Sequence, residues 1–115
     1  MVSARWKPWL LDATHAGELE GDDVRRGRAE HPVCGDLVEL SLRCVHGRIE
    51  AVRWRASGCP ATMAVTALCA KVLHGTVPAD ATAALAAAVA AHGGLAVHER
   101  HAEALVGRAL RAAGC

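Results

Sequence analysis

Alternation of apolar and polar residues marks the middle of the chain. In residues 37–45 the positions expected to face a core are Val38, Leu40, Leu42 and Cys44. Residues 48–56 alternate in the same way, and His46-Gly47 between them suits a tight turn. A period of two puts successive side chains on opposite faces of a strand. The two segments are therefore predicted to form a β-hairpin with one polar face.

The pattern becomes helical after the hairpin. Apolar residues recur with spacings of three and four at Val65, Leu68, Cys69 and Val72. This spacing predicts a helix that begins at Pro60, which suits the first helical position, and ends at His74-Gly75. Two further helices are predicted over residues 79–91 and about 99–113.

The segments before the hairpin are less regular. Residues 16–32 are rich in glycine and charge, which indicates a loop with one irregular strand, and residues 1–15 could form a docking helix or a flexible arm. Strands followed by a run of helices predict an α+β fold, here a three-stranded antiparallel sheet covered by the C-terminal helices. The length of 115 residues fits a single domain over residues 1–115.

Charge and composition argue against nucleic acid and membrane surfaces as partners. The chain has 13 Lys and Arg against 12 Asp and Glu, so it lacks the basic excess that nucleic acid or a membrane surface requires. We find no apolar run of transmembrane length and no secretory signal, and we therefore expect a cytoplasmic protein with reduced thiols. Its five cysteines are an odd number and do not have the spacing of a disulfide framework.

Two cysteines stand out as candidates for chemistry. Cys34 and Asp36 flank Gly35 on a turn before the first hairpin strand, where a thiolate and a carboxylate could bind a metal. Cys59 directly precedes a helix, whose N-terminus favours the thiolate form. Structural roles are the alternative: Cys34 could be a buried turn residue, and Cys59 could simply be a poor N-cap.

The other candidates are weaker. Cys69 lies on the apolar stripe of its helix and Cys44 on a strand, so both are expected to be structural. His98 and His101 are three residues apart at a helix start and could share one face. The remaining histidines are interpreted as solvated or satisfied groups.

These motifs, together, resemble a known family. Residues 30–36 (EHPVCGD), the hairpin, residues 56–62 (ASGCPAT) and the helix that follows are similar to iron–sulfur cluster assembly scaffolds of the IscU/NifU type, including SufU-like members. Residues 15–21 (HAGELEG) also resemble the N-terminal loop of that family. The resemblance implies a SufE/NifU-like fold and a protein that assembles a [2Fe–2S] cluster and passes it on.

The resemblance assigns roles by position. Cys34 corresponds to the first ligand, Asp36 to the assisting carboxylate and Cys59 to the second ligand. His101 corresponds to a histidine that commonly precedes the third ligand cysteine, and Ala102 stands where that cysteine would be. Residues 95–99 (LAVHE) replace the chaperone-binding segment Leu-Pro-Pro-Val-Lys, which leaves chaperone binding in doubt.

Three functions follow from these assignments. In the first, the chain is a non-enzymatic scaffold that binds iron or a cluster through Cys34, Asp36, Cys59 and His101, with a cysteine desulfurase and recipient apo-proteins as partners. In the second, the same residues hold zinc, the expected metal of the purified protein, in a relative that modulates a desulfurase. In the third, Cys59 is the nucleophile of a thiol enzyme and His101 its base.

Overall fold

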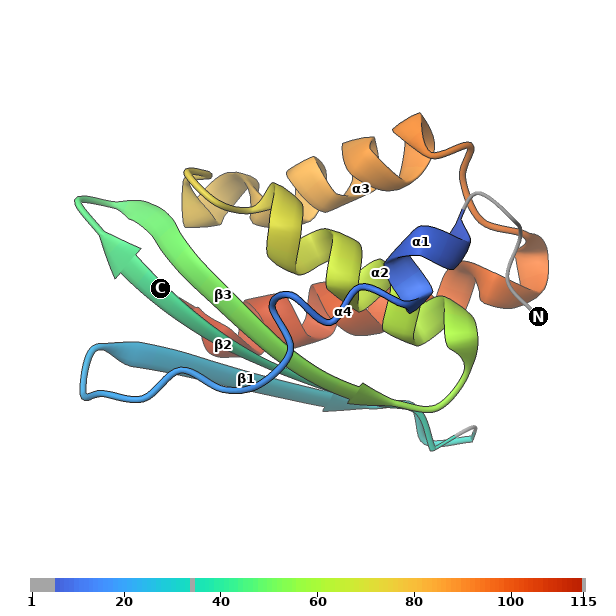
Figure 1. The fold of residues 1–115 in the computed structure, drawn as a ribbon, viewed down its shortest axis with the longest axis horizontal. Coiled ribbons are helices and arrows are strands. Elements are labelled where there is room, and N and C mark those ends of the chain that lie inside the picture. Colours follow the sequence, from blue (N-terminus) through green and yellow to red (C-terminus); the bar gives the residue numbers. More distant parts are fainter. Residues whose placement is uncertain (1–5, 34, 115) are drawn as a thin grey trace.

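An antiparallel three-stranded sheet forms one side of the molecule, and helices cover one of its faces (Figure 1). The computed structural model describes residues 6–33 and 35–114. The elements in chain order are α1 (Lys7–Leu10), β1 (Val24–Glu30), β2 (Leu37–Val45), β3 (Arg48–Ser57), α2 (Pro60–Val72), η2 (Pro78–Asp80), α3 (Ala81–Ala91), η3 (Val97–Glu99) and α4 (Arg100–Ala113). This architecture confirms the predicted α+β fold.

The hairpin forms as predicted from its alternating residues. The strand order is β1-β2-β3, and Leu40 at the centre of β2 pairs with Gly27 on one side and Trp54 on the other. His46 and Gly47 both have positive φ, as a two-residue turn with the twist of a hairpin requires. In β2, Val38, Leu40 and Leu42 are buried in the hydrophobic core, whereas Glu39 is exposed.

Strand β1 is more regular than the sequence indicated. It pairs with β2 along seven residues without a break, although only Val24 and Gly27 in it are buried. A Cβ at Gly27 would collide with the backbone of α4 at Ala109 and Ala113. The glycine that weakens the strand pattern in the sequence thus allows close helix–sheet packing.

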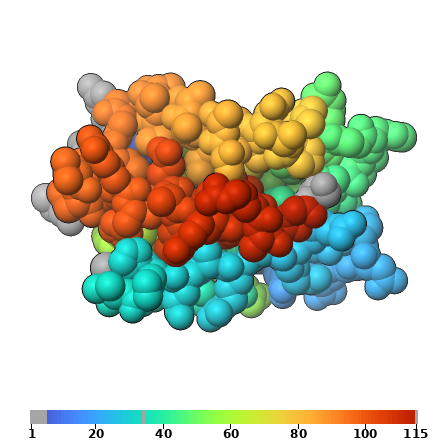
Figure 2. All heavy atoms as spheres, turned by 180° about the vertical axis from the view of Figure 1, so that it is seen from behind, coloured from blue at the N-terminus to red at the C-terminus, as the bar shows by residue number. Residues whose placement is uncertain are grey.

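The helices form two layers over the sheet. Helices α2 and α4 pack against the strands, and α3 packs on α2 and α4 (Figure 1). Seen from behind, α4 runs between α3 and β1 with one side exposed (Figure 2). Nine of the thirteen residues of α2 are buried, because this helix lies between the sheet and the other helices.

The N-terminal segment contacts both the helices and the opposite face of the sheet. Helix α1 packs on α2, and the indole of Trp6, which has no exposed surface, donates a hydrogen bond to the carbonyl of Gly94. The chain then pairs briefly with the edge of β3 through Ala16. It continues over the sheet face opposite the helices, where the backbone N–H of Leu19 donates to Ser41 Oγ at 2.9 Å.

Candidate metal centre

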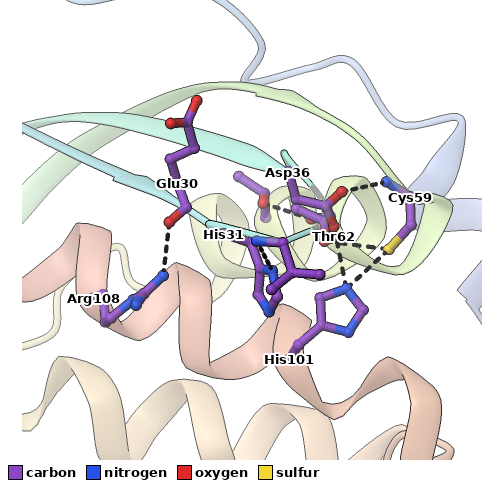
Figure 3. Close-up of polar contacts among 9 residues, drawn as sticks. Glu30, His31, Asp36, Cys59, Thr62, His101 and Arg108 are labelled. Carbon is purple, nitrogen blue, oxygen red and sulfur yellow. Dashed lines mark hydrogen bonds and ion pairs between the residues drawn. The ribbon is translucent and has the colours of Figure 1, made fainter.

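Three side chains from distant parts of the chain converge at one end of the sheet (Figure 3). Asp36 lies in the loop before β2, Cys59 directly precedes α2, and His101 is in the first turn of α4. The His101 Nε2 atom is 3.1 Å from Asp36 Oδ2 and 3.4 Å from Cys59 Sγ. One potential ligand atom from each residue lies within 4.8 Å of the other two.

Asp36 is the buried member of this group, with 3 % of its surface exposed. Its Oδ1 accepts a hydrogen bond from the backbone N–H of Cys59, and its Oδ2 accepts one from the hydroxyl of Thr62 at 2.8 Å. Burial alone raises the pKa of a carboxyl group, but the hydrogen bonds from Thr62, Cys59 and His101 more than offset it and lower the pKa of Asp36. The carboxylate is therefore held ionised.

Cys59 is placed by the turn that joins β3 to α2. Its own backbone is extended, and the preceding Gly58 has a φ of +125°, a conformation that other residues rarely adopt. A Cβ at Gly58 would also collide with the side chain of Asp36. The thiol lies 3.4 Å from Thr62 Oγ1 and does not cap the helix.

The loop that contains Cys34 is closed by its flanking residues. The backbone N–H of His31 donates to the carbonyl of Asp36, and the N–H of Gly35 donates to the carbonyl of His31, both at 2.8 Å. The His31 ring meets the His101 ring edge to face, with 5.5 Å between centroids. Cys34 itself lies outside the described residues, so its predicted role as a ligand stays a prediction.

Thr62 and His31 contribute to the site but were not selected from the sequence. Thr62 follows Cys59 by three residues, a spacing that puts its hydroxyl on the same side of the first helical turn. That spacing was a usable signal for Thr62. No comparable sequence signal exists for His31, because its contact with His101 depends on the packing of α4 against the loop.

The thiolate, imidazole and carboxylate form a donor set suited to zinc or iron. Ala102 contributes nothing to it, because its methyl side chain has no donor atom and is fully buried in the hydrophobic core. Cys69 is also in the core, where burial raises the pKa of its thiol to about 12, so it remains protonated as its predicted structural role requires. Within the described residues, the convergent donors are Asp36, Cys59 and His101.

A small cavity of about 70 Å³ opens beside these donors. It is lined by Cys59, Pro60, Ala61, His98, Glu99 and His101. Asp36 lies behind the site and does not line the cavity. A group that approaches from outside therefore meets the thiol and the imidazole first.

Comparison with known proteins shows the family of the chain. The NifU-like N terminal domain family matches residues 9–114. Two relatives from Archaeoglobus fulgidus, named iron-sulfur cluster assembly scaffold proteins IscU 1 and IscU 2, are each 32% identical over 100 residues. That alignment covers 86% of this chain and 65% of each relative, so the chain spans less than two thirds of their length.

Solved structures share the fold at lower sequence identity. One is described as an iron-sulfur cluster assembly scaffold protein for the SUF system from Fervidobacterium islandicum, with a TM-score of 0.77, 15% identity and coverage of 96% of this chain and 94% of that one. Another is the N-terminal part of a NifU-like protein from Brucella abortus, with a TM-score of 0.65, 18% identity and coverage of 95% and 76%. In the described part of the chain, no helix has the length and apolar character to span a membrane. The chain belongs to the NifU-like N terminal domain family.

Proposed function

We propose that the chain is an iron–sulfur cluster assembly scaffold that binds iron or a [2Fe–2S] cluster as cargo through Cys34, Asp36, Cys59 and His101. The observation that carries this proposal is the convergence of Asp36, Cys59 and His101 from three separate elements. The names of its relatives, IscU scaffold proteins and a SUF-system scaffold, support the same assignment. The scaffold acts by holding and releasing its cargo and is not itself an enzyme.

The donor set suits cargo that must leave again. Iron–sulfur clusters rest mainly on thiolates, and with Cys34 as a ligand the proposed site would offer two thiolates, one imidazole and one carboxylate. The Asp36 carboxylate already has hydrogen-bond partners in Thr62 and Cys59 to which it can return when the metal departs. A cysteine desulfurase as sulfur source and recipient apo-proteins, all cytoplasmic, complete the proposed pathway.

Anaerobic reconstitution tests the scaffold proposal. The protein is incubated with ferrous iron, cysteine and a desulfurase, and the absorption spectrum of a cluster is followed. Cys59→Ser and Cys34→Ser should abolish the spectrum. Cys69→Ser is the matched control and should retain it, because that thiol is buried away from the site. Failure of the unmodified protein to form a cluster would contradict the proposal.

A second function, a zinc-holding protein that modulates a desulfurase, is favoured by Ala102. Its buried methyl group leaves the site without a third thiolate at this position, and two cysteines with Asp36 and His101 form a complete tetrahedral set for zinc. Metal analysis of protein purified without added metal should then find one zinc per chain. Retention of that zinc in Cys34→Ala and His101→Ala would contradict this alternative.

A further inference from the structure

His98 lies at the entrance of the metal centre without belonging to its three convergent donors. It is in η3, three residues before His101, and both residues line the cavity of about 70 Å³ beside Cys59. A cavity of this size holds only a few water molecules, so its walls are within side-chain reach of one another. Cys59, His98 and His101 therefore border one small space.

The backbone around His98 is fixed, whereas its side chain is exposed. The next residue, Glu99, is buried, and its carboxylate accepts a hydrogen bond from the backbone N–H of Ala96 at 3.1 Å. The Glu99 N–H in turn donates to the Ala96 carbonyl. This reciprocal pair holds the turn in place on both sides of His98, while His98 itself is exposed.

We propose that His98 is an entering ligand, which takes the metal ion from the cavity side during loading and release. This inference rests on the proposed metal centre and adds a fifth residue to its function. Neutral imidazole is a good ligand for both zinc and iron. When its nitrogen forms a bond to the metal, the Asp36 carboxylate leaves with its negative charge and returns to the hydrogen bonds of Thr62 and Cys59.

The position of His98 distinguishes it from other exposed histidines. His46 lies in the hairpin turn, and His74 follows α2. Neither lines the cavity at Cys59. They have the same imidazole chemistry at a distance from the donors, which makes His74→Ala a matched control for His98→Ala.

Cobalt exchange tests the proposal. Each variant is loaded with one Co²⁺ per chain under anaerobic conditions, its visible spectrum is recorded, and transfer to a chromophoric chelator is followed by stopped flow. His98→Ala should bind Co²⁺ with the same stoichiometry and spectrum as the unmodified protein. Its transfer to the chelator should be slower by about tenfold, and His74→Ala should match the unmodified protein.

The remaining outcomes each overturn a different statement. Equal transfer rates in His98→Ala and His74→Ala would refute the entering ligand while leaving the metal centre intact. A changed Co²⁺ spectrum in His98→Ala would show a resting ligand instead and would also refute it. If the unmodified chain bound no Co²⁺, the metal centre itself would be wrong, and the role of His98 with it.

Discussion

Two histidines near the ends of the segment 92–101 occupy opposite kinds of surroundings. His92 is half-buried, and its Nε2 accepts a hydrogen bond from the indole of Trp9 at 2.6 Å, while its Nδ1 lies 3.3 Å from the carbonyl of Ala88. The rings of Trp6 and Trp9 both contact it. His101 instead directs Nε2 at a carboxylate and a thiol beside an open cavity.

The partners of each ring decide what it can do. An indole N–H only donates, so His92 Nε2 must be unprotonated and Nδ1 carries the proton toward the Ala88 carbonyl. Nε2 thus joins His92 to α1 through Trp9, while Nδ1 fixes the ring on the last turn of α3 through Ala88. His101 shares its Nε2 with a carboxylate and a thiol, two kinds of group that commonly bind metals in proteins. We conclude that His92 belongs to a structural cluster with Trp6 and Trp9, and His101 to the candidate metal centre.

Trp6→Ala should give the largest effect and should break only the structural cluster. Removing a fully buried Trp side chain costs about 3–5 kcal/mol of unfolding free energy, measured by urea denaturation. Co²⁺ binding at low temperature should keep one site per chain. A loss below about 1 kcal/mol would show that the aromatic cluster does not hold the fold.

Thr62→Val should give the largest effect confined to the binding site. The Thr62 hydroxyl positions Asp36, and loss of such a supporting hydrogen bond weakens metal affinity by roughly 10- to 100-fold. The matched control is Thr66→Val, since Thr66 is equally buried but donates to the carbonyl of Thr62. Titration with Co²⁺ should separate the two variants, and equal affinities would contradict the role given to Thr62.

The sequence was sufficient for the fold because its strongest patterns coincide with packing. The alternation holds along most of β2 and β3, since each strand has one face on the core, and it is interrupted where the register shifts between Arg43 and Cys44. The sequence indicated only an irregular strand in the place of β1. The reason is that Gly27, which faces the core, is a glycine so that α4 can pack closely, and a glycine does not contribute to an apolar alternation. Burial on nearly all sides of α2 likewise could not be read from a single apolar stripe.

The candidate site was predictable in part for a similar reason. Asp36, Cys59 and His101 are chemically distinctive residues in recognisable motifs, and the structure brings them together. The hydrogen bond between His92 and Trp9 joins residues 83 positions apart, so it could not be predicted from a local sequence pattern. The sequence separated His101 from His92 by its position at a helix start and by the family resemblance, and the partners of each ring agree with that separation.

Protonation of Asp36 in acid should lower the free energy of unfolding of the metal-free protein. Its pKa is lower in the folded state than in the unfolded chain, so its contribution to stability is present above the unfolded pKa, near 4, and is lost as pH falls through the folded value. Urea midpoints measured from pH 6 to 2 should fall less steeply in Asp36→Asn. The exposed Asp22 provides the control, because Asp22→Asn should retain the full slope.

The smallest effect should come from a double-mutant cycle on Trp9 and His92. Trp9→Phe keeps an aromatic ring but removes the N–H donor, and His92→Ala removes the acceptor. A net hydrogen bond contributes about 0.5–1.5 kcal/mol, so the two changes should be coupled by about 1 kcal/mol in urea denaturation. Trp9→Phe also frees His92 Nε2, yet Co²⁺ stoichiometry should remain one per chain, because that nitrogen has no carboxylate or thiol among its described contacts. A second bound Co²⁺ in this variant would mean that an available imidazole suffices for binding, and that the Asp36–Cys59 pair is not what distinguishes His101.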